Sequence, residues 1–500
     1  MIPLDGESLT LEQVSSVASG AETAALSPDA RRRMEASRAA VEKLLAGDRV
    51  VYGVNTGVGR LADVRIDHAQ LGQLQLNVVR SHAAGVGPPL DAAEVRAMML
   101  IRANVLAKGL SGIRPQVAEM LCEMLNRGVC PLVPSRGSVG ASGDLAPLAH
   151  IALVLIGEGE AVVAGERLRG RDALTRAGLE PLALQPKEGV SLLNGTQAML
   201  AVGSLALLES ETLVEAADVL CALTLDALRG TPVAFDERLH QARPHPGQAA
   251  SAANLRAMLE GSDIRASHLD CARVQDAYSL RCAPQVHGAV RDVLAAARRA
   301  FSLELNSATD NPLVFGDEVL SGGNFHGQPV AVWLDALAIA MASLAGISER
   351  RVERLVNPAL NEGLPPFLAS SPGLESGLMM LQITAASLVA ECRVLATPAS
   401  VQSITTSGDK EDFVSMGQTA ALKLKQVVEN TRQVLAIEAI SAAQALDFLL
   451  PLKPGPRAQQ AYNSIRRFVA PLSGDRALSA DISEFSAAIR SGQFTSSLRR

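Results

Sequence analysis

Apolar residues that recur every three or four positions dominate the second half of the chain. The segment 196–229 contains no proline and few glycines, and it keeps this helical spacing along its whole length. The same pattern predicts further long helices at 328–356, 376–395 and 414–449. Helices that are apolar over most of their surface must be buried in a bundle or against other copies of the chain.

The N-terminal part of the chain has a different texture. It mixes short helical patterns with loops rich in glycine and proline, and 160–166 has the alternation and turn residues of a β-hairpin. The texture changes after Asn194. We therefore predict a mainly α protein with two domains, residues 1–193 and a helical bundle at 194–500.

Composition and charge exclude several classes of protein. Of the 500 residues, 48% are hydrophobic and 20% are charged, which is typical of a globular protein. The net charge of −6 and the absence of a long basic run argue against a nucleic-acid partner. Neither a phosphate-binding loop motif nor a zinc-binding H-E-x-x-H helix occurs, so we expect no nucleotide or metal cofactor.

The sequence also bears on location. Residues 1–10 include Asp5 and Glu7 and lack the basic-then-apolar order of an export signal. The six cysteines show no C-x-x-C spacing, which indicates reduced thiols. Asp335 interrupts the apolar stretch around Trp333, so we expect no membrane span and a cytoplasmic protein.

The glycine-rich run 137–150 carries the most specific chemistry. Its plain interpretation is a turn that leads into a helix capped by Ser142 or Asp144. A chemical interpretation is cyclisation of the backbone, because Gly143 has no side chain and its nitrogen can approach the carbonyl of Ala141 closely. Ring closure and loss of water from Ser142 would leave a methylidene group on an imidazolone, which is an electrophile that no ordinary side chain supplies.

With this run, the chain resembles the aromatic amino acid lyase family, whose 4-methylidene-imidazol-5-one (MIO) group forms from Ala-Ser-Gly. The resemblance covers roughly residues 50 to 450 and implies the family's mainly α, fumarase-like superhelical fold. It also implies an amino-acid substrate and a homotetramer whose active sites draw on more than one subunit. Six further motifs carry the resemblance, in the family's order: 52–57, 80–85, 193–197, 275–282, 321–326 and 411–417.

Eliminating ammonia from an amino acid requires help at two atoms, because the β-hydrogen is barely acidic and the amine leaves poorly. The resemblance implies that Ala141-Ser142-Gly143 supplies an electrophile and that Tyr52 is the base. A free tyrosine is protonated at neutral pH, so the site must stabilise the phenolate. Tyr278 is the other tyrosine with an implied catalytic role. Whether the electrophile captures the amine or attacks the aromatic ring stays open, and we favour the amine.

Several polar residues match the family's binding residues. Arg281 suits the substrate carboxylate, because its planar fork makes two hydrogen bonds. Asn194 resembles the residue that binds the MIO oxygen or the substrate, and Gln275 is a weaker member of the same group. Phe325 resembles the residue that covers the substrate ring. Asp144 is expected to assist ring formation, although a helix cap explains it equally well.

The substrate follows from two positions. The pair Ser81-His82 resembles the one found in family members that act on histidine. Those members also carry a glutamate at the position of Glu411, where members that act on phenylalanine or tyrosine have glutamine. An imidazole N–H can donate to the Glu411 carboxylate, whereas a phenyl group would leave that carboxylate desolvated without a partner. Met379 fits an apolar pocket wall. We therefore expect an ammonia-lyase that converts L-histidine to trans-urocanate.

Other outcomes stay open at this point. Lys410 and Phe413 depart from the Asn-Gln-Glu-Asp-His run that histidine-specific members often show, which leaves room for a substituted histidine. A tyrosine or phenylalanine ammonia-lyase, or a 2,3-aminomutase, would use the same group. A catalytically dead helical scaffold is a different class, and the intact Ala141–Gly143 run, Tyr52 and Arg281 argue against it.

Overall fold

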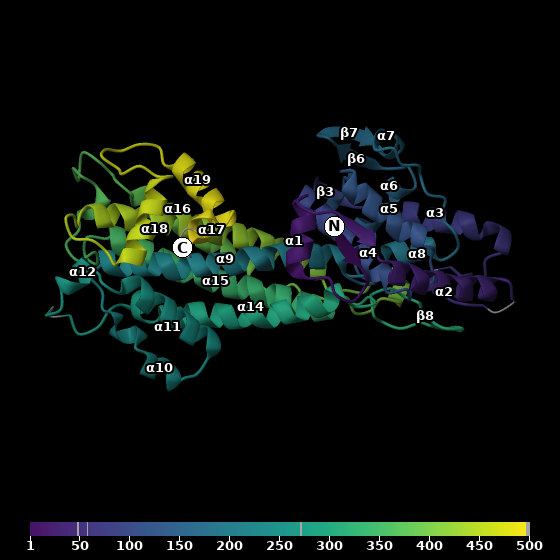
Figure 1. The fold of residues 1–500 in the computed structure, drawn as a ribbon, viewed down its shortest axis with the longest axis horizontal. Coiled ribbons are helices and arrows are strands. Elements are labelled where there is room, and N and C mark those ends of the chain that lie inside the picture. Colours follow the sequence, from purple (N-terminus) through teal and green to yellow (C-terminus); the bar gives the residue numbers. More distant parts are fainter. Residues whose placement is uncertain (48–49, 58, 271–272, 497–500) are drawn as a thin grey trace. The chain divides into compact units, whose positions relative to one another are not determined.

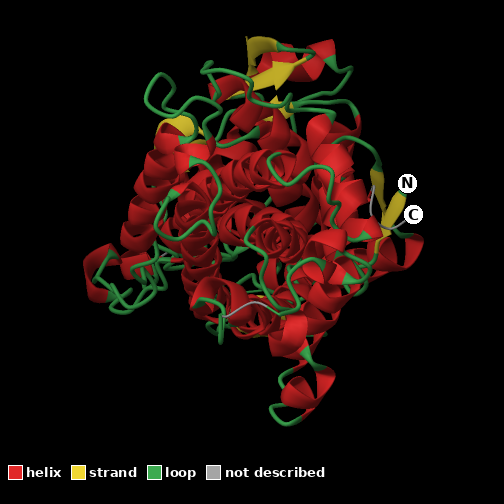
Figure 2. Cartoon of the chain, turned by 90° about the vertical axis from the view of Figure 1, so that its left-hand side faces the viewer, coloured by secondary structure: helices red, strands yellow, loops and turns green. Residues whose placement is uncertain are grey.

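A computed structural model describes residues 1–47, 50–57, 59–270 and 273–496. Helices make up most of the chain and the strands are short (Figures 1 and 2). The chain divides into two compact units. The first comprises residues 1–205, 298–335 and 398–422, and the second comprises 206–297, 336–397 and 423–500. Each unit is built from three separate stretches of the chain. The predicted domains, 1–193 and 194–500, divide the chain in another way, and this division stays a prediction.

The first unit combines short helices with small sheets. In it, β1 pairs with β2, β3 with β5, β6 with both β4 and β7, and β8 with β9. Its elements are β1 (Ile2–Leu4), α1 (Leu11–Ala18), β2 (Ala24–Leu26), α2 (Pro28–Leu45), η1 (Gly59–Leu61), η2 (His68–Gln70), α3 (Leu71–His82), β3 (Val86–Pro89), α4 (Ala92–Ala107), α5 (Pro115–Asn126), β4 (Cys130–Pro131), β5 (Pro134–Arg136), α6 (Leu145–Leu155), β6 (Glu160–Val163), β7 (Glu166–Arg169), α7 (Gly170–Arg176), α8 (Glu188–Leu193), β8 (Leu313–Phe315), β9 (Glu318–Leu320) and η5 (Ser407–Asp409).

In its described residues the second unit consists of helices and loops and contains no strand. The long helices α9 (Gln197–Ala227), α14 (Ala283–Leu305), α15 (Gln328–Val356) and α17 (Gly417–Asp447) contribute residues to both units. Its other elements are η3 (Pro232–Phe235), α10 (Glu237–Gln241), α11 (Pro246–Leu259), α12 (Asp263–Ala266), α13 (Tyr278–Arg281), η4 (Pro366–Leu368), α16 (Met379–Leu395), α18 (Pro456–Arg466), α19 (Ser479–Arg490) and α20 (Gln493–Ser496).

The four long helices predicted from periodicity are confirmed as α9, α15, α16 and α17, and the hairpin near residue 160 is β6–β7. Within the first unit, α9 packs closely at Gly203, where a Cβ atom would lie 2.5 Å from Leu334 Cδ2 of α15. The core of this unit also includes α4, which is buried on every side from Ala97 to Ala107, as expected of a helix without a polar face.

The structure corrects one argument: the apolar stretch around Trp333 is not interrupted at Asp335, and the expectation of no membrane span stays a prediction. Of the described residues, helix α15 is long and apolar enough to cross a membrane, and 56% of its most apolar stretch is buried inside the protein. Asp335 does not break this stretch, because its side chain is buried and accepts a hydrogen bond from the Ser400 N–H (2.7 Å). A buried carboxylate oxygen that accepts a hydrogen bond is tolerated in a buried helix.

Candidate active site

The Ala-Ser-Gly segment is bound on both sides of Gly143 by a single residue. The N–H of Gly195 donates to the carbonyl of Ser142 (3.3 Å), and the carbonyl of Gly195 accepts from the N–H of Asp144 (2.7 Å). Gly143 has a φ of +72°, and a Cβ atom there would lie 2.1 Å from the Gly195 oxygen. Only glycine fits this position, and we call this pair of hydrogen bonds the Gly195 clamp.

The start of the segment is held by residues distant in sequence. The hydroxyl of Ser415 donates to the carbonyl of Gly140 (3.0 Å), and the N–H of Met416 donates to the carbonyl of Val139 (2.8 Å). Gly140 has a φ of +69°, and a Cβ atom there would lie 2.1 Å from Ser415 Oγ. The run is therefore restrained at both ends before any chemistry occurs.

Asp144 is fully buried at the start of α6. Its carboxylate accepts hydrogen bonds from Ser138 Oγ and from the N–H of Met199, each at 2.8 Å. Burial raises the pKa of Asp144 to about 6, and these hydrogen bonds oppose the rise. The carboxylate thus anchors the segment to the first turn of α9, which explains its burial without requiring a reaction.

The Glu411 side chain lies against the serine of the segment. Ser142 Oγ donates to Glu411 Oε1 (3.2 Å), and Thr406 Oγ1 donates to Glu411 Oε2 (2.7 Å). Thr406 and Glu411 also pair through their backbones across a tight turn. Both carboxylate oxygens are therefore oriented, and one of them faces the reacting segment.

His82 ends α3 with a defined ring orientation. Its Nδ1 lies 2.7 Å from the carbonyl of Val78, which can only accept, so Nδ1 carries the proton. In the neutral ring, Nε2 is then free to accept a hydrogen bond. The neighbouring Ser81 Oγ donates to the same carbonyl (3.3 Å).

The Tyr52 loop packs against two other parts of the first unit. Tyr52 is partly buried, and its hydroxyl accepts a long hydrogen bond from the Gly59 N–H (3.5 Å). Gly53 approaches Pro312 and Gly59 approaches Ser407, so that added Cβ atoms would lie 3.0 Å and 2.8 Å from those residues. This loop therefore contacts the turn that precedes Glu411.

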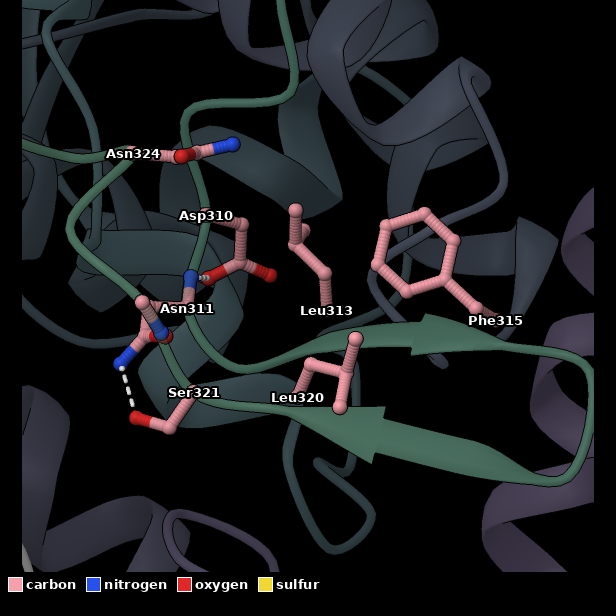
Figure 3. A pocket seen from close by; sticks show the side chains of 8 residues that line it. Asp310, Asn311, Leu313, Phe315, Leu320, Ser321 and Asn324 are labelled. Carbon is pink, nitrogen blue, oxygen red and sulfur yellow. Dashed lines mark hydrogen bonds between the residues drawn. The ribbon is translucent and has the colours of Figure 1, made fainter.

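Asn194 connects the clamp to a small cavity. Its Nδ2 donates to the carbonyl of Asn311 (2.9 Å), and Asn311 lines a cavity of about 160 Å³ beside the β8–β9 hairpin (Figure 3). Asn324, which precedes the partly buried Phe325, lies at the same cavity. The other lining residues are Asp310, Leu313, Phe315, Leu320, Ser321 and Gly322.

The remaining predicted site residues belong to the second unit. Tyr278 is 71% exposed, and the Arg281 guanidinium lies over its ring, 4.5 Å from the centroid. Gln275 is exposed and Met379, the first residue of α16, is partly buried. The structure therefore gathers Tyr52, Ser81, His82, Ala141–Asp144, Asn194, Phe325 and Glu411 in one unit, and Gln275, Tyr278, Arg281 and Met379 in the other.

Comparison with known proteins gives the family of the chain. The family described as aromatic amino acid lyase matches residues 9–467. The chain belongs to the aromatic amino acid lyase family. It is 58% identical to the histidine ammonia-lyase of Koribacter versatilis, over 99% of each chain. Among solved structures, histidine ammonia-lyase from Trypanosoma cruzi is 41% identical with a TM-score of 0.93, covering 100% of this chain and 95% of that one. Tyrosine aminomutase from Streptomyces globisporus is 40% identical with a TM-score of 0.95, covering 100% and 98%.

Two departures from the histidine-specific run can now be located. Lys410 is exposed and makes no ion pair with Glu411 in the part of the chain that the structure describes. Phe413 is exposed and stacks on His326, with ring centroids 6.2 Å apart. Neither side chain changes the hydrogen bonds of the Glu411 carboxylate.

Sequence reasoning missed the residues that orient the site in this family member. Thr406 carries no motif, although its place five residues before Glu411, next to Ser407-Gly408-Asp409, is typical of a tight turn. Arg102 lies in the middle of an apolar helix and is 1% exposed. A charge in the middle of such an apolar stretch is the signal that was available, because a charge is rarely buried without a partner.

Proposed function

We propose that the protein is a histidine ammonia-lyase, which removes ammonia from L-histidine without oxidation and releases trans-urocanate. The observation that carries this proposal is the Glu411 carboxylate, held by Thr406 with one oxygen turned to Ser142. An imidazole N–H can donate to this carboxylate, and a phenyl or phenol ring offers no ring N–H. Curated relatives named histidine ammonia-lyase, at 52–59% identity over nearly the whole chain, support it.

The prosthetic group proposed for this reaction is MIO, formed from Ala141-Ser142-Gly143. The residues present fit it, because Gly143 has no room for a side chain and the Gly195 clamp holds the peptide groups on either side of it. Once formed, the group supplies an electrophile that makes the substrate amine a better leaving group. Asp144 supports the segment by anchoring it to α9.

The other residues of the first unit bind and orient the substrate or move a proton. Tyr52 takes the β-proton, and its loop contacts the turn before Glu411, which couples the base to the ring-binding residue. His82 offers Nε2 to a donor on the substrate. Asn194 binds the MIO oxygen or a polar group of the substrate, and Phe325 covers the substrate ring.

The second unit supplies the carboxylate site. Arg281 binds the substrate carboxylate through its fork, Tyr278 assists catalysis, and Gln275 and Met379 line the pocket. The exposure of Tyr278 and of Val274, at 71% and 93%, supports a role of this segment in the active site of another subunit.

Shared sites require an oligomer, and we propose a homotetramer. Helix α16 exposes Met380, Ile383 and Val394 on one face. An exposed apolar helix face of this kind is typical of a surface covered by another chain. The prediction that the protein is cytoplasmic rests on its sequence alone.

Incubation with L-histidine tests the substrate, because urocanate is conjugated and absorbs in the near ultraviolet. L-tyrosine, L-phenylalanine and a side-chain-substituted histidine are the comparison substrates, and a β-amino acid product would indicate the aminomutase alternative. Intact-mass spectrometry tests the group, since the mature chain should be lighter than its sequence mass by two waters. The variant Ser142→Ala should fold and lose all turnover, and retained turnover would rule out the proposed group.

A further inference from the structure

The Gly195 clamp is itself held by a buried arginine. Arg102, from α4, donates through Nη1 to the carbonyl of Asn194 and to Gln197 Oε1 (3.0 Å), and through Nη2 to the carbonyl of Ser191. One guanidinium therefore binds the residues immediately before and shortly after Gly195. A Cβ atom on Gly195 would lie 2.8 Å from Arg102 Nη1, so the contact is direct.

Arg102 keeps its charge in this environment. Burial lowers its pKa to about 10, and the nearby Asp310 carboxylate opposes that fall. Burial would raise the pKa of Asp310, but the cations of Lys187 and Arg102 hold it below its usual value. Lys187 and Asp310 lie 3.5 Å apart with no exposure. The result is a buried cluster of two cations and one carboxylate beside the clamp.

A buried charge cluster is costly, and apolar residues of the same volume often serve stability as well. What a guanidinium supplies in addition is geometry, because its planar fork fixes two acceptors relative to each other. Here the acceptors are carbonyls at the end of α8, on the short connection that carries Gly195. Fixing that connection fixes the hydrogen-bond partner of both Ser142 and Asp144.

We propose that Arg102 is a positioning residue for ring formation, acting through Asn194 and the Gly195 clamp on Ala141-Ser142-Gly143. This inference rests on the proposed function. In ring closure, the nitrogen of Gly143 bonds to the carbonyl carbon of Ala141 and its proton passes to the carbonyl oxygen. That oxygen leaves as water with the proton of the Ser142 nitrogen. The Ser142 hydroxyl then leaves as a second water with the Ser142 α-proton, so the two losses balance without an oxidant.

The test measures maturation separately from folding and from activity. Full-length wild-type protein, Arg102→Lys and Arg102→Met are purified soon after expression, and intact mass is followed over time for the fraction of chains lighter by two waters. Circular dichroism gives the folded fraction of each sample. Arg102→Lys keeps the charge but loses the fork, and we expect maturation at least tenfold slower in folded protein. Turnover per matured site should stay close to that of wild type.

Arg351→Lys is the matched control. Arg351 is also fully buried and makes a forked ion pair, with Glu438, but both residues belong to the second unit and do not touch the clamp. We expect this variant to lose stability and to mature at the wild-type rate.

Each outcome has a distinct meaning. Folded Arg102→Lys that matures as fast as wild type overturns the inference, as does equal slowing in Arg351→Lys. If Arg102→Met does not fold, Arg102→Lys alone decides. If the wild-type chain itself keeps its full sequence mass, the proposed function fails instead, and the two failures are distinguishable.

Discussion

Replacing Gly195 by alanine would place a methyl group where the structure leaves no room for it. The residue has a φ of +140°, a conformation that L side chains rarely adopt. The added Cβ atom would lie 2.4 Å from Gln197 Oε1 and 2.8 Å from both Arg102 Nη1 and Thr309 Oγ1. Gln197 hydrogen-bonds to both Arg102 and Thr309, so none of the three side chains can move without breaking a buried hydrogen bond.

The expected loss of stability follows from these contacts. Backbone strain at such a position costs about 1–3 kcal/mol. Displacing a hydrogen bond to a charged group costs about 1.5–3 kcal/mol more. We therefore expect Gly195→Ala to lower the free energy of unfolding by roughly 2.5–6 kcal/mol. The entropy of unfolding is about 2.1 cal/mol/K per residue, so a chain of 500 residues loses about 1 °C of midpoint per kcal/mol.

Thermal unfolding followed by circular dichroism measures this change, and intact mass on the same samples reports ring formation. Gly346→Ala is the matched control, since Gly346 lies inside α15 with open space around its Cβ position. Alanine there should raise stability by about 0.5–1 kcal/mol. If Gly195→Ala unfolds at the wild-type midpoint and matures completely, the Gly195 clamp is needed neither for stability nor for ring formation.

Three further predictions concern single side chains. Glu411→Gln removes the charged carboxylate that accepts an imidazole N–H, so kcat/KM for L-histidine should fall about 10–100-fold. The kcat/KM for L-phenylalanine should change little, and equal losses on both substrates would remove the argument for histidine. Thr406→Val frees Glu411 Oε2, and KM for L-histidine should rise about 3–10-fold in steady-state kinetics, whereas an unchanged KM would mean that Thr406 does not orient the carboxylate. Burial lowers the pKa of His150, whose Nε2 accepts a hydrogen bond from the Gly85 N–H (3.2 Å). The contribution of neutral His150 to stability is therefore present above pH 6.5, and it is lost as the pH falls through the folded-state pKa. The variant His150→Gln keeps an acceptor without titrating, so denaturation at pH 7.5 and 5.5 should show a smaller acid loss than wild type, and an identical loss would exclude His150 as its source.

Much of the helical architecture was predictable because helix periodicity is local. Helix α15 matches its predicted bounds, and α9 and α17 differ from theirs by at most three residues at each end. Local patterns also mislead where a loop contains its own structure. The segment after α14 contains the β8–β9 hairpin, which its polar, glycine-rich composition concealed.

Adjacent residues alone define part of the chemistry of this chain: three consecutive backbone units can cyclise, and the motifs follow one another in the order of one family. The residues that hold this segment in place come from distant parts of the chain, and only the folded structure brings them together. Gly195 reaches Ser142 across 53 positions and Glu411 reaches it across 269, and Arg102 supports the clamp from a third segment. Such contacts depend on how helices and loops pack, and side-chain periodicity contains no information about the partner on the far side of a buried interface.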